Sequence, residues 1–266
     1  MLVKIALTAG LVLLAGPIQA HGLIENVGET LLPVILSGSF LATFWLMYCI
    51  GAQRVPPTTS RWLVFLGASL ISALILIVPL DGRIAGGSAM HMLQHMLIMV
   101  VIAPLYVLAQ PLPQWVAANG RAAVLLFRPL LRLSRYPMRA GFLQAVVIWF
   151  WHSPKFYNLT LESSWWHLIE HICFALGAGV FWWSVLVGKR AVGALLALLI
   201  TLMHTGMLGA VLTFTQTPLY GDSHDLQDQQ LAGLIMWVPG GLFYLIAGGW
   251  CGLRWLQNHA RTINSI

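Results

Sequence analysis

Long apolar runs separated by short polar segments make up most of the chain. A helix needs about 20 apolar residues to cross a hydrocarbon layer of about 30 Å, and several runs are close to that length. Backbone polar groups in lipid must bond within their own segment, so runs of this kind predict helices. The pattern predicts an all-α fold, a polytopic membrane bundle of seven transmembrane helices. The predicted spans are residues 30–51, 61–80, 89–110, 140–158, 165–187, 191–214 and 231–254.

The first residues have the pattern of a secretory signal peptide. One basic residue, Lys4, precedes a short apolar core, and a small residue, Ala20, offers a cleavage position. Residues 1–20 are therefore predicted to be removed, which leaves residues 21–266 as a single seven-span membrane domain. An uncleaved anchor helix is the alternative interpretation.

Composition and charge agree with a membrane protein. The chain is 59% apolar and 8% charged, which excludes an ordinary soluble domain, of which about 25% is charged. Its formal net charge of +6 comes from bases that gather in alternate connections, whereas most acids lie in the opposite ones. The positive-inside rule then predicts an N-out/C-in topology and makes nucleic-acid binding a poor explanation of the charge. The three cysteines lie singly within apolar runs and indicate neither a disulfide framework nor a thiolate zinc site.

The connection at about residues 112–139 is basic and amphipathic. Its arginines recur at spacings that line one helical face, which predicts a segment on the inner membrane surface. Contact with anionic lipid and docking of a cytoplasmic partner both fit this pattern. The arginines are Arg121, Arg128, Arg132, Arg135 and Arg139.

Histidines within the spans are the strongest functional signal. His91 and His95, like His167 and His171, are four residues apart, so each pair projects from one helical face. Glu170 is the one acid placed inside a predicted span. Ionisable groups in lipid are costly, and imidazole is a common metal ligand, so a metal or haem site in the outer half of the bundle is predicted. The predicted ligands are His91, His95, His152, His167, His171 and His204.

Ligand type favours copper. Thioethers near imidazoles suit Cu(I), and methionines surround the first pair and flank His204, at Met203 and Met207. His21 becomes a further copper ligand if cleavage follows Ala20. Asp228 either orients a ligand histidine or caps a helix. The residues expected to support the ligands are Gln94, Glu170, Asp228, Met92 and Met96.

Several other functions are consistent with these residues. A haem-binding membrane electron carrier would use histidines of facing helices as axial ligands. A copper transporter would need a polar path to the inner face, and an assembly scaffold would use the histidines only for helix contacts. The string from His167 to His171 also matches the His-x-x-Glu-His signature of zinc peptidases, although five residues are weak evidence. No catalytic residues are predicted.

An ordered set of motifs resembles the multi-spanning CtaG family of cytochrome c oxidase assembly factors. The motifs are His-Met-Leu-Gln-His-Met from His91, Trp-His-Ser-Pro around His152, the pair His167 and His171, and the segment from Asp228 to Gly240. The resemblance covers nearly all of the chain after residue 20. It implies a non-catalytic protein of the bacterial inner membrane that helps to supply copper to a haem-copper oxidase. Its partners would be oxidase subunits or other assembly proteins. Transfer of copper would favour an accessible site near the outer surface.

Overall fold

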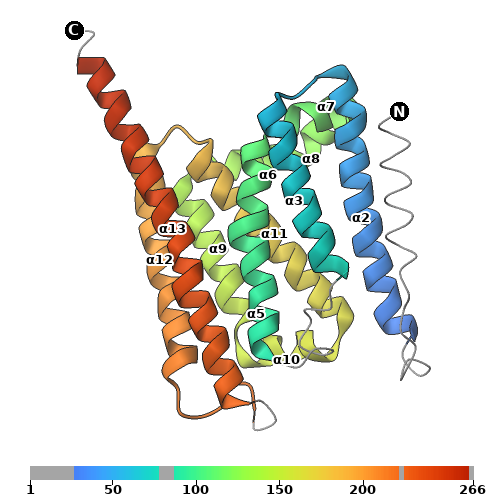
Figure 1. The fold of residues 1–266 in the computed structure, drawn as a ribbon, viewed down its shortest axis with the longest axis vertical. Helices are drawn as coiled ribbons and strands as arrows, with labels where there is room; N and C mark the ends of the chain where they lie inside the picture. Colours follow the sequence, from blue (N-terminus) through green and yellow to red (C-terminus); the bar gives the residue numbers. More distant parts are fainter. Residues whose placement is uncertain (1–26, 78–86, 222–224, 264–266) are drawn as a thin grey trace.

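The computed structural model describes residues 27–77, 87–221 and 225–263, and these residues form an all-helical bundle (Figure 1). The helices are α2 (Val27–Arg54), α3 (Thr59–Ile77), α5 (Ser88–Met96), the π-helical segment η1 (Leu97–Ile102), α6 (Ala103–Ala109), α7 (Leu112–Asn119), α8 (Arg121–Leu133), α9 (Pro137–Trp151), α10 (Pro154–Glu162), α11 (Ser164–Leu186), α12 (Ala191–Phe214) and α13 (Leu226–Ile263). The prediction of an all-α polytopic bundle is confirmed.

Within the described residues, five helical segments are long and apolar enough to cross a membrane. They coincide with five of the seven predicted spans. The predicted spans at residues 61–80 and 140–158 correspond to shorter helices, α3 and α9. The long segments are Leu32–Arg54, Ser88–Ala109, Ser164–Leu186, Ala191–Phe214 and Leu226–Asn258.

The predicted span at residues 140–158 is interrupted. The helix α9 ends at Trp151, and α10 begins at Pro154. Proline disfavours helical backbone in the residue before it, and Ser153 is extended, with φ −70° and ψ 140°. With 15 residues, α9 is about 22 Å long, which is shorter than the expected span.

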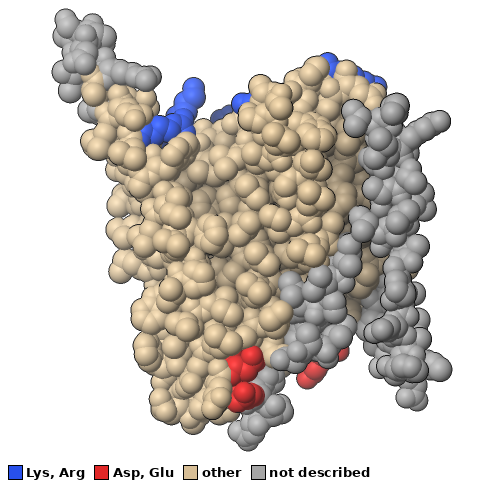
Figure 2. All heavy atoms as spheres, in the orientation of Figure 1, with Lys and Arg blue, Asp and Glu red and all other residues tan. Residues whose placement is uncertain are grey.

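The helices run back and forth between the two ends of the bundle. In Figure 1 the helices α7 and α8 lie at one end and α10 lies at the other. Gly120, at a positive φ of 59°, separates α7 from α8 within the connection at residues 112–139. Figure 2 shows lysine and arginine side chains at the α7 and α8 end, and acidic side chains at the α10 end. In this view the bases and the acids therefore lie at opposite ends of the bundle, while Lys155 on α10 is a base at the acidic end.

Apolar side chains cover the outside of the bundle as well as its core. Phe142 is 72% exposed and Phe214 65% exposed, which suits a surface that faces lipid. The interior is filled by side chains of α5, α9, α11, α12 and α13, such as Phe174, Phe181 and Trp182. A second aromatic cluster around Tyr48 and Phe65 joins α2, α3, α6 and α7. These cores hold the helices at fixed distances.

The π-helical segment η1 follows α5 directly and begins two residues after its second histidine, His95. A π-turn shifts the helix phase, and such turns are frequent at functional sites. Here the indole Nε1 of Trp182 donates a hydrogen bond of 2.8 Å to the carbonyl of Met99 within η1. Because Trp182 lies on α11, this bond ties the two helices that carry the paired histidines.

A close contact between helix backbones joins α12 to α13 at two glycines. A Cβ atom on Gly233 would lie 2.6 Å from the carbonyl oxygen of Gly209, and one on Gly209 would lie 2.9 Å from the carbonyl of Gly233. Real Cβ atoms do not approach so closely. The glycines are therefore required for the two backbones to meet, as in other membrane helix pairs.

Gly233→Ala is expected to destabilise the bundle, because the added methyl would push α12 and α13 apart. Overpacking of this kind costs about 1–3 kcal/mol. Thermal unfolding of purified protein in detergent measures the loss. Gly248→Ala in the same helix is the matched control, since nothing lies within 4 Å of its added methyl. Equal melting temperatures for the two variants would contradict this account of the contact.

Candidate metal centre

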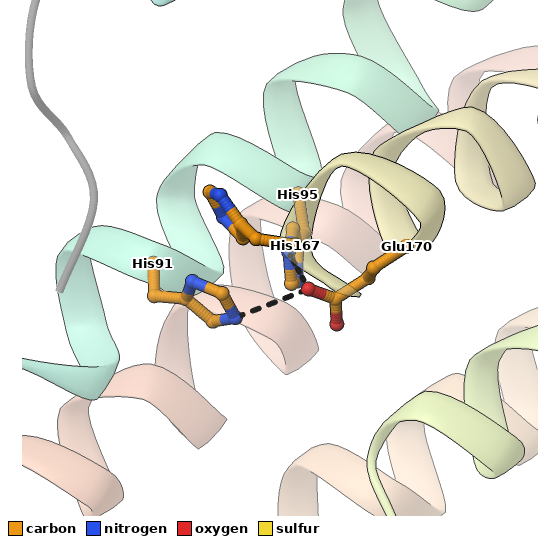
Figure 3. A group of neighbouring side chains, drawn as sticks. All are labelled: His91, His95, His167 and Glu170. Atoms are coloured by element: carbon orange, nitrogen blue, oxygen red, sulfur yellow. Dashed lines mark ion pairs between the residues drawn. The ribbon is translucent and has the colours of Figure 1, made fainter. Parts of the chain in front are cut away.

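The carboxylate of Glu170 lies among imidazoles in the interior of the bundle (Figure 3). Its Oε2 atom is 3.6 Å from Nε2 of His91 and 3.3 Å from Nε2 of His95, and all three residues have 0% exposure. Removal of a carboxylate from water costs several kcal/mol unless a cation or hydrogen-bond donors compensate. The position therefore favours a cation, either a proton on an imidazole or a metal ion.

Four buried residues together form a candidate metal site, called here the four-residue site. One ligand atom from each of them lies within 4.8 Å of the other three. Imidazole nitrogens and a carboxylate oxygen are ligands for zinc, copper, iron and nickel, at about 2.0–2.2 Å for zinc. A small closing movement would bring the four atoms around one ion. The residues are His91, His95, His167 and Glu170.

Helical spacing explains why these side chains meet. His91 and His95 lie one turn apart on α5, and His167 and His171 lie one turn apart on α11. The ring centroids of His91 and His167 are 5.2 Å apart, and those of His95 and His171 are 5.4 Å apart. Each histidine of α5 thus faces one histidine of α11.

His152 joins this group from a third helix. It follows the last residue of α9, and its ring centroid is 6.2 Å from that of His95. Its Nδ1 is 2.8 Å from the carbonyl oxygen of Ile148. A carbonyl only accepts, so Nδ1 carries the hydrogen and Nε2 presents a lone pair. Nε2 is buried and has no hydrogen-bond partner within residues 27–77, 87–221 and 225–263.

The structure does not bring the predicted ligand His204 to these histidines. His204 is half-buried on α12, and no ring contact among the described residues connects it to another histidine. Its neighbours Met203 and Met207 are 66% and 55% exposed, so they face away from the core. The expectation that these two thioethers support a copper site stays a prediction. His21 lies outside the described residues, as does the predicted cleavage position.

Asp228 supports the helix that carries the first histidine pair. Both of its carboxylate oxygens lie 3.3 Å from the backbone N–H of Ala89, at the start of α5. A Cβ atom on Gly87, which has a φ of 145°, would lie 2.5 Å from Asp228 Oδ2. Asp228 belongs to α13, so it caps a neighbouring helix, an arrangement that sequence spacing does not reveal. Glycine before α5 makes room for the carboxylate.

The other predicted supporting residues are buried. Gln94 is 6% exposed, and its Oε1 has no hydrogen-bond partner in the described part of the chain. Met92 and Met96 belong to the apolar core. Met96 packs against α13, since its Cε is 2.7 Å from the position that a Cβ on Gly240 would take. Met92 and Met96 therefore have a structural role in the apolar core, whether or not they also support the histidines.

Two tyrosines cover the site towards the α10 end of the bundle. The ring of Tyr157 on α10 is 5.4 Å from that of His91 and stacks at 3.7 Å on Tyr220. The hydroxyl of Tyr220 donates a 3.4 Å hydrogen bond to the carbonyl of His152. The expected accessible site is thus closed in this structure. Tyr220 carries no sequence signal, because a single loop tyrosine has no characteristic spacing.

Comparison with known families gives one result. The family model described as cytochrome c oxidase caa3 assembly factor (Caa3_CtaG) matches residues 42–258. This range contains α3 to α12 entirely, the C-terminal part of α2 and most of α13. Neither the curated proteins nor the solved structures include a match to this chain.

Asp228→Ala is expected to lower the thermal stability of the protein, because the first turn of α5 loses its acceptor. Loss of such a cap costs about 0.5–2 kcal/mol. Asp228→Asn keeps one acceptor oxygen and is expected to lose less. Melting temperatures in detergent compare the two variants with the unaltered protein. An Asn variant as unstable as the Ala variant would show that the cap is not the reason for the loss.

Proposed function

Because the chain belongs to the cytochrome c oxidase caa3 assembly factor family, we propose that it binds copper at the four-residue site and delivers it to a haem-copper oxidase during assembly. The observation that carries this proposal is the approach of three buried imidazoles to one buried carboxylate. The metal is the cargo, and the chain supplies ligands and a dry interior. Its partner is an oxidase subunit that receives the metal or another assembly protein.

The site lies on the outer side of the membrane in this proposal. The basic end of the bundle carries α7 and α8, and the acidic end carries α10 (Figures 1 and 2). The positive-inside rule assigns the basic end to the cytoplasm of a bacterial inner membrane. With α3 and α9 as short spans, the chain then crosses seven times, N-out and C-in. The cleaved signal peptide at residues 1–20 stays a prediction.

The packing between the site and the basic end of the bundle favours delivery of copper to a partner over its transport across the membrane. Towards the basic end, the space between α11 and α13 is occupied by Phe181 and Trp182, which are 0% and 2% exposed. The ring of Trp182 is stacked 5.6 Å from that of Tyr244 on α13. A transporter would need a polar path through this aromatic layer. The site instead lies closest to the acidic end, where a partner outside the membrane would meet it.

Replacement of His91 and His95 together by alanine is expected to abolish copper binding at the four-residue site. The oxidase of cells that carry only this variant is expected to lose most of its activity. Metal analysis of the purified protein and oxidase assays on membranes measure the two effects. His204→Ala, a histidine on another helix outside these contacts, is the matched control. Unchanged copper and unchanged oxidase activity in the double variant would overturn the proposal.

The absorption spectrum of the purified protein is expected to lack a Soret band. The carboxylate of Glu170 fills the space beside these imidazoles: its Oε2 lies 3.6 Å from His91 Nε2 and 3.3 Å from His95 Nε2, and all three residues have 0% exposure, so the packed interior leaves no room for a porphyrin. A haem carrier would need two axial ligands on opposite sides of the macrocycle. A strong Soret band with stoichiometric haem would favour the electron-carrier function instead.

A further inference from the structure

The histidines of α5 and α11 form two cross-helix pairs, one turn apart. The first pair is His91 with His167, and the second is His95 with His171. Both helices run in the same direction in Figure 1, so the order of the pairs follows the order of the residues. The arrangement contains two cross-helix imidazole pairs of similar centroid separation, with ring planes at 27° in the first and 89° in the second, and a site for one ion does not require two such pairs.

The distance within each pair suits one bound metal ion. A metal–nitrogen distance of about 2.0–2.1 Å and a tetrahedral angle place the centroids of two coordinating imidazoles about 5.2 Å apart. The observed separations are 5.2 Å for His91 and His167 and 5.4 Å for His95 and His171. Each pair therefore already has the width of a two-histidine metal position.

The distance between the pairs suits two metal ions side by side. The centroids of His91 and His95 are 4.1 Å apart, and so are those of His167 and His171. Metal ions in two-metal sites lie about 3.5–4 Å apart. One ion in each pair would thus have the usual spacing of a dinuclear centre.

Glu170 occupies the position of a shared ligand. Its Oε2 is 3.6 Å from Nε2 of His91, in the first pair, and 3.3 Å from Nε2 of His95, in the second. A carboxylate has two oxygens and accepts from two directions. Glu170 can therefore bind to both ions at once, and its negative charge compensates part of theirs.

His152 completes the second position. Its Nδ1–H is held by the carbonyl of Ile148, the outer contact that metal-bound histidines commonly make. Its Nε2 is buried, has no hydrogen-bond partner in the described residues, and its ring lies beside His95. The 6.2 Å separation of the His95 and His152 rings exceeds the width of a loaded pair by about 1 Å, so a small shift of His152 would complete three imidazole ligands.

We propose that the centre binds two copper ions, the first between His91 and His167 and the second among His95, His171 and His152, with Glu170 shared by both. This proposal rests on the proposed copper function and adds its stoichiometry. A second ion in the same centre means that one molecule carries two coppers to its client.

Metal content of the full chain tests the proposal. Purified protein in detergent is loaded with Cu(I) without oxygen, exposed to a competing chelator, and its copper is counted by mass spectrometry. The unaltered protein is expected to retain two coppers per chain. His152→Ala and His167→Ala are each expected to retain one, which also shows that each variant is folded. His204→Ala, the matched control, is expected to retain two.

The spacing of the ions is tested by electron paramagnetic resonance after loading with Cu²⁺. Two coppers about 4 Å apart couple magnetically, so the unaltered protein is expected to show a spin-coupled spectrum. His152→Ala is expected to show the spectrum of one isolated ion.

The outcomes separate this proposal from the function on which it rests. No bound copper in the unaltered protein contradicts both. One copper per chain contradicts only the dinuclear centre, as do two uncoupled coppers. Loss of both coppers, or of neither, from the His152→Ala variant also overturns the separate second position.

Discussion

The buried carboxylate of Glu170 is the constraint on which the rest of the structure depends. A charge inside a membrane bundle costs several kcal/mol, and only cations or donors close to it offset that cost. The imidazoles of His91 and His95, at 3.6 and 3.3 Å, are placed to provide this compensation when they bind a proton or share a metal. Helices α5 and α11 must therefore lie face to face at this depth, and the surrounding contacts keep them there.

Contacts outside the four-residue site fix its candidate ligands by orienting whole helices. Asp228 of α13 holds the first turn of α5, and the indole of Trp182 on α11 binds the carbonyl of Met99 just after it. At the end of α9, the carbonyl of Ile148 fixes the ring of His152 by accepting a hydrogen bond from its Nδ1–H. Ligands placed in this way are preorganised, because little rotamer freedom is left to lose when a metal binds. The close α12 and α13 contact at the glycines supplies the rigid background for them.

Helical periodicity was enough to predict the centre of the site but not its surroundings. The spacing of His91 and His95 implies a common face in any α-helix, and the same holds on α11, so both pairs were predictable without coordinates. The cap from Asp228 joins residues far apart in sequence, and no local pattern predicts such a contact. The end of α9 was missed because the predicted span was extended past the polar residues His152 to Lys155 as far as residue 158, although Pro154 stops the helix. The exposure of Met203 and Met207 could not be predicted either, because it depends on which face of α12 packs against α13.

Closure of the site and the proposed delivery of copper impose opposite demands. A dry interior strengthens electrostatic attraction and so favours tight binding, but 0% exposure of three of the ligands leaves a partner nothing to contact. On the basic side, Phe181 and Trp182 fill the bundle between long packed helices. At the acidic end the cover is the short helix α10 and the stacked rings of Tyr157 and Tyr220. Because few contacts resist movement of a short helix and a loop, this side is the cheaper one to open. In the proposed function, exchange with an oxidase subunit would then occur at the acidic end, which the positive-inside rule would place outside.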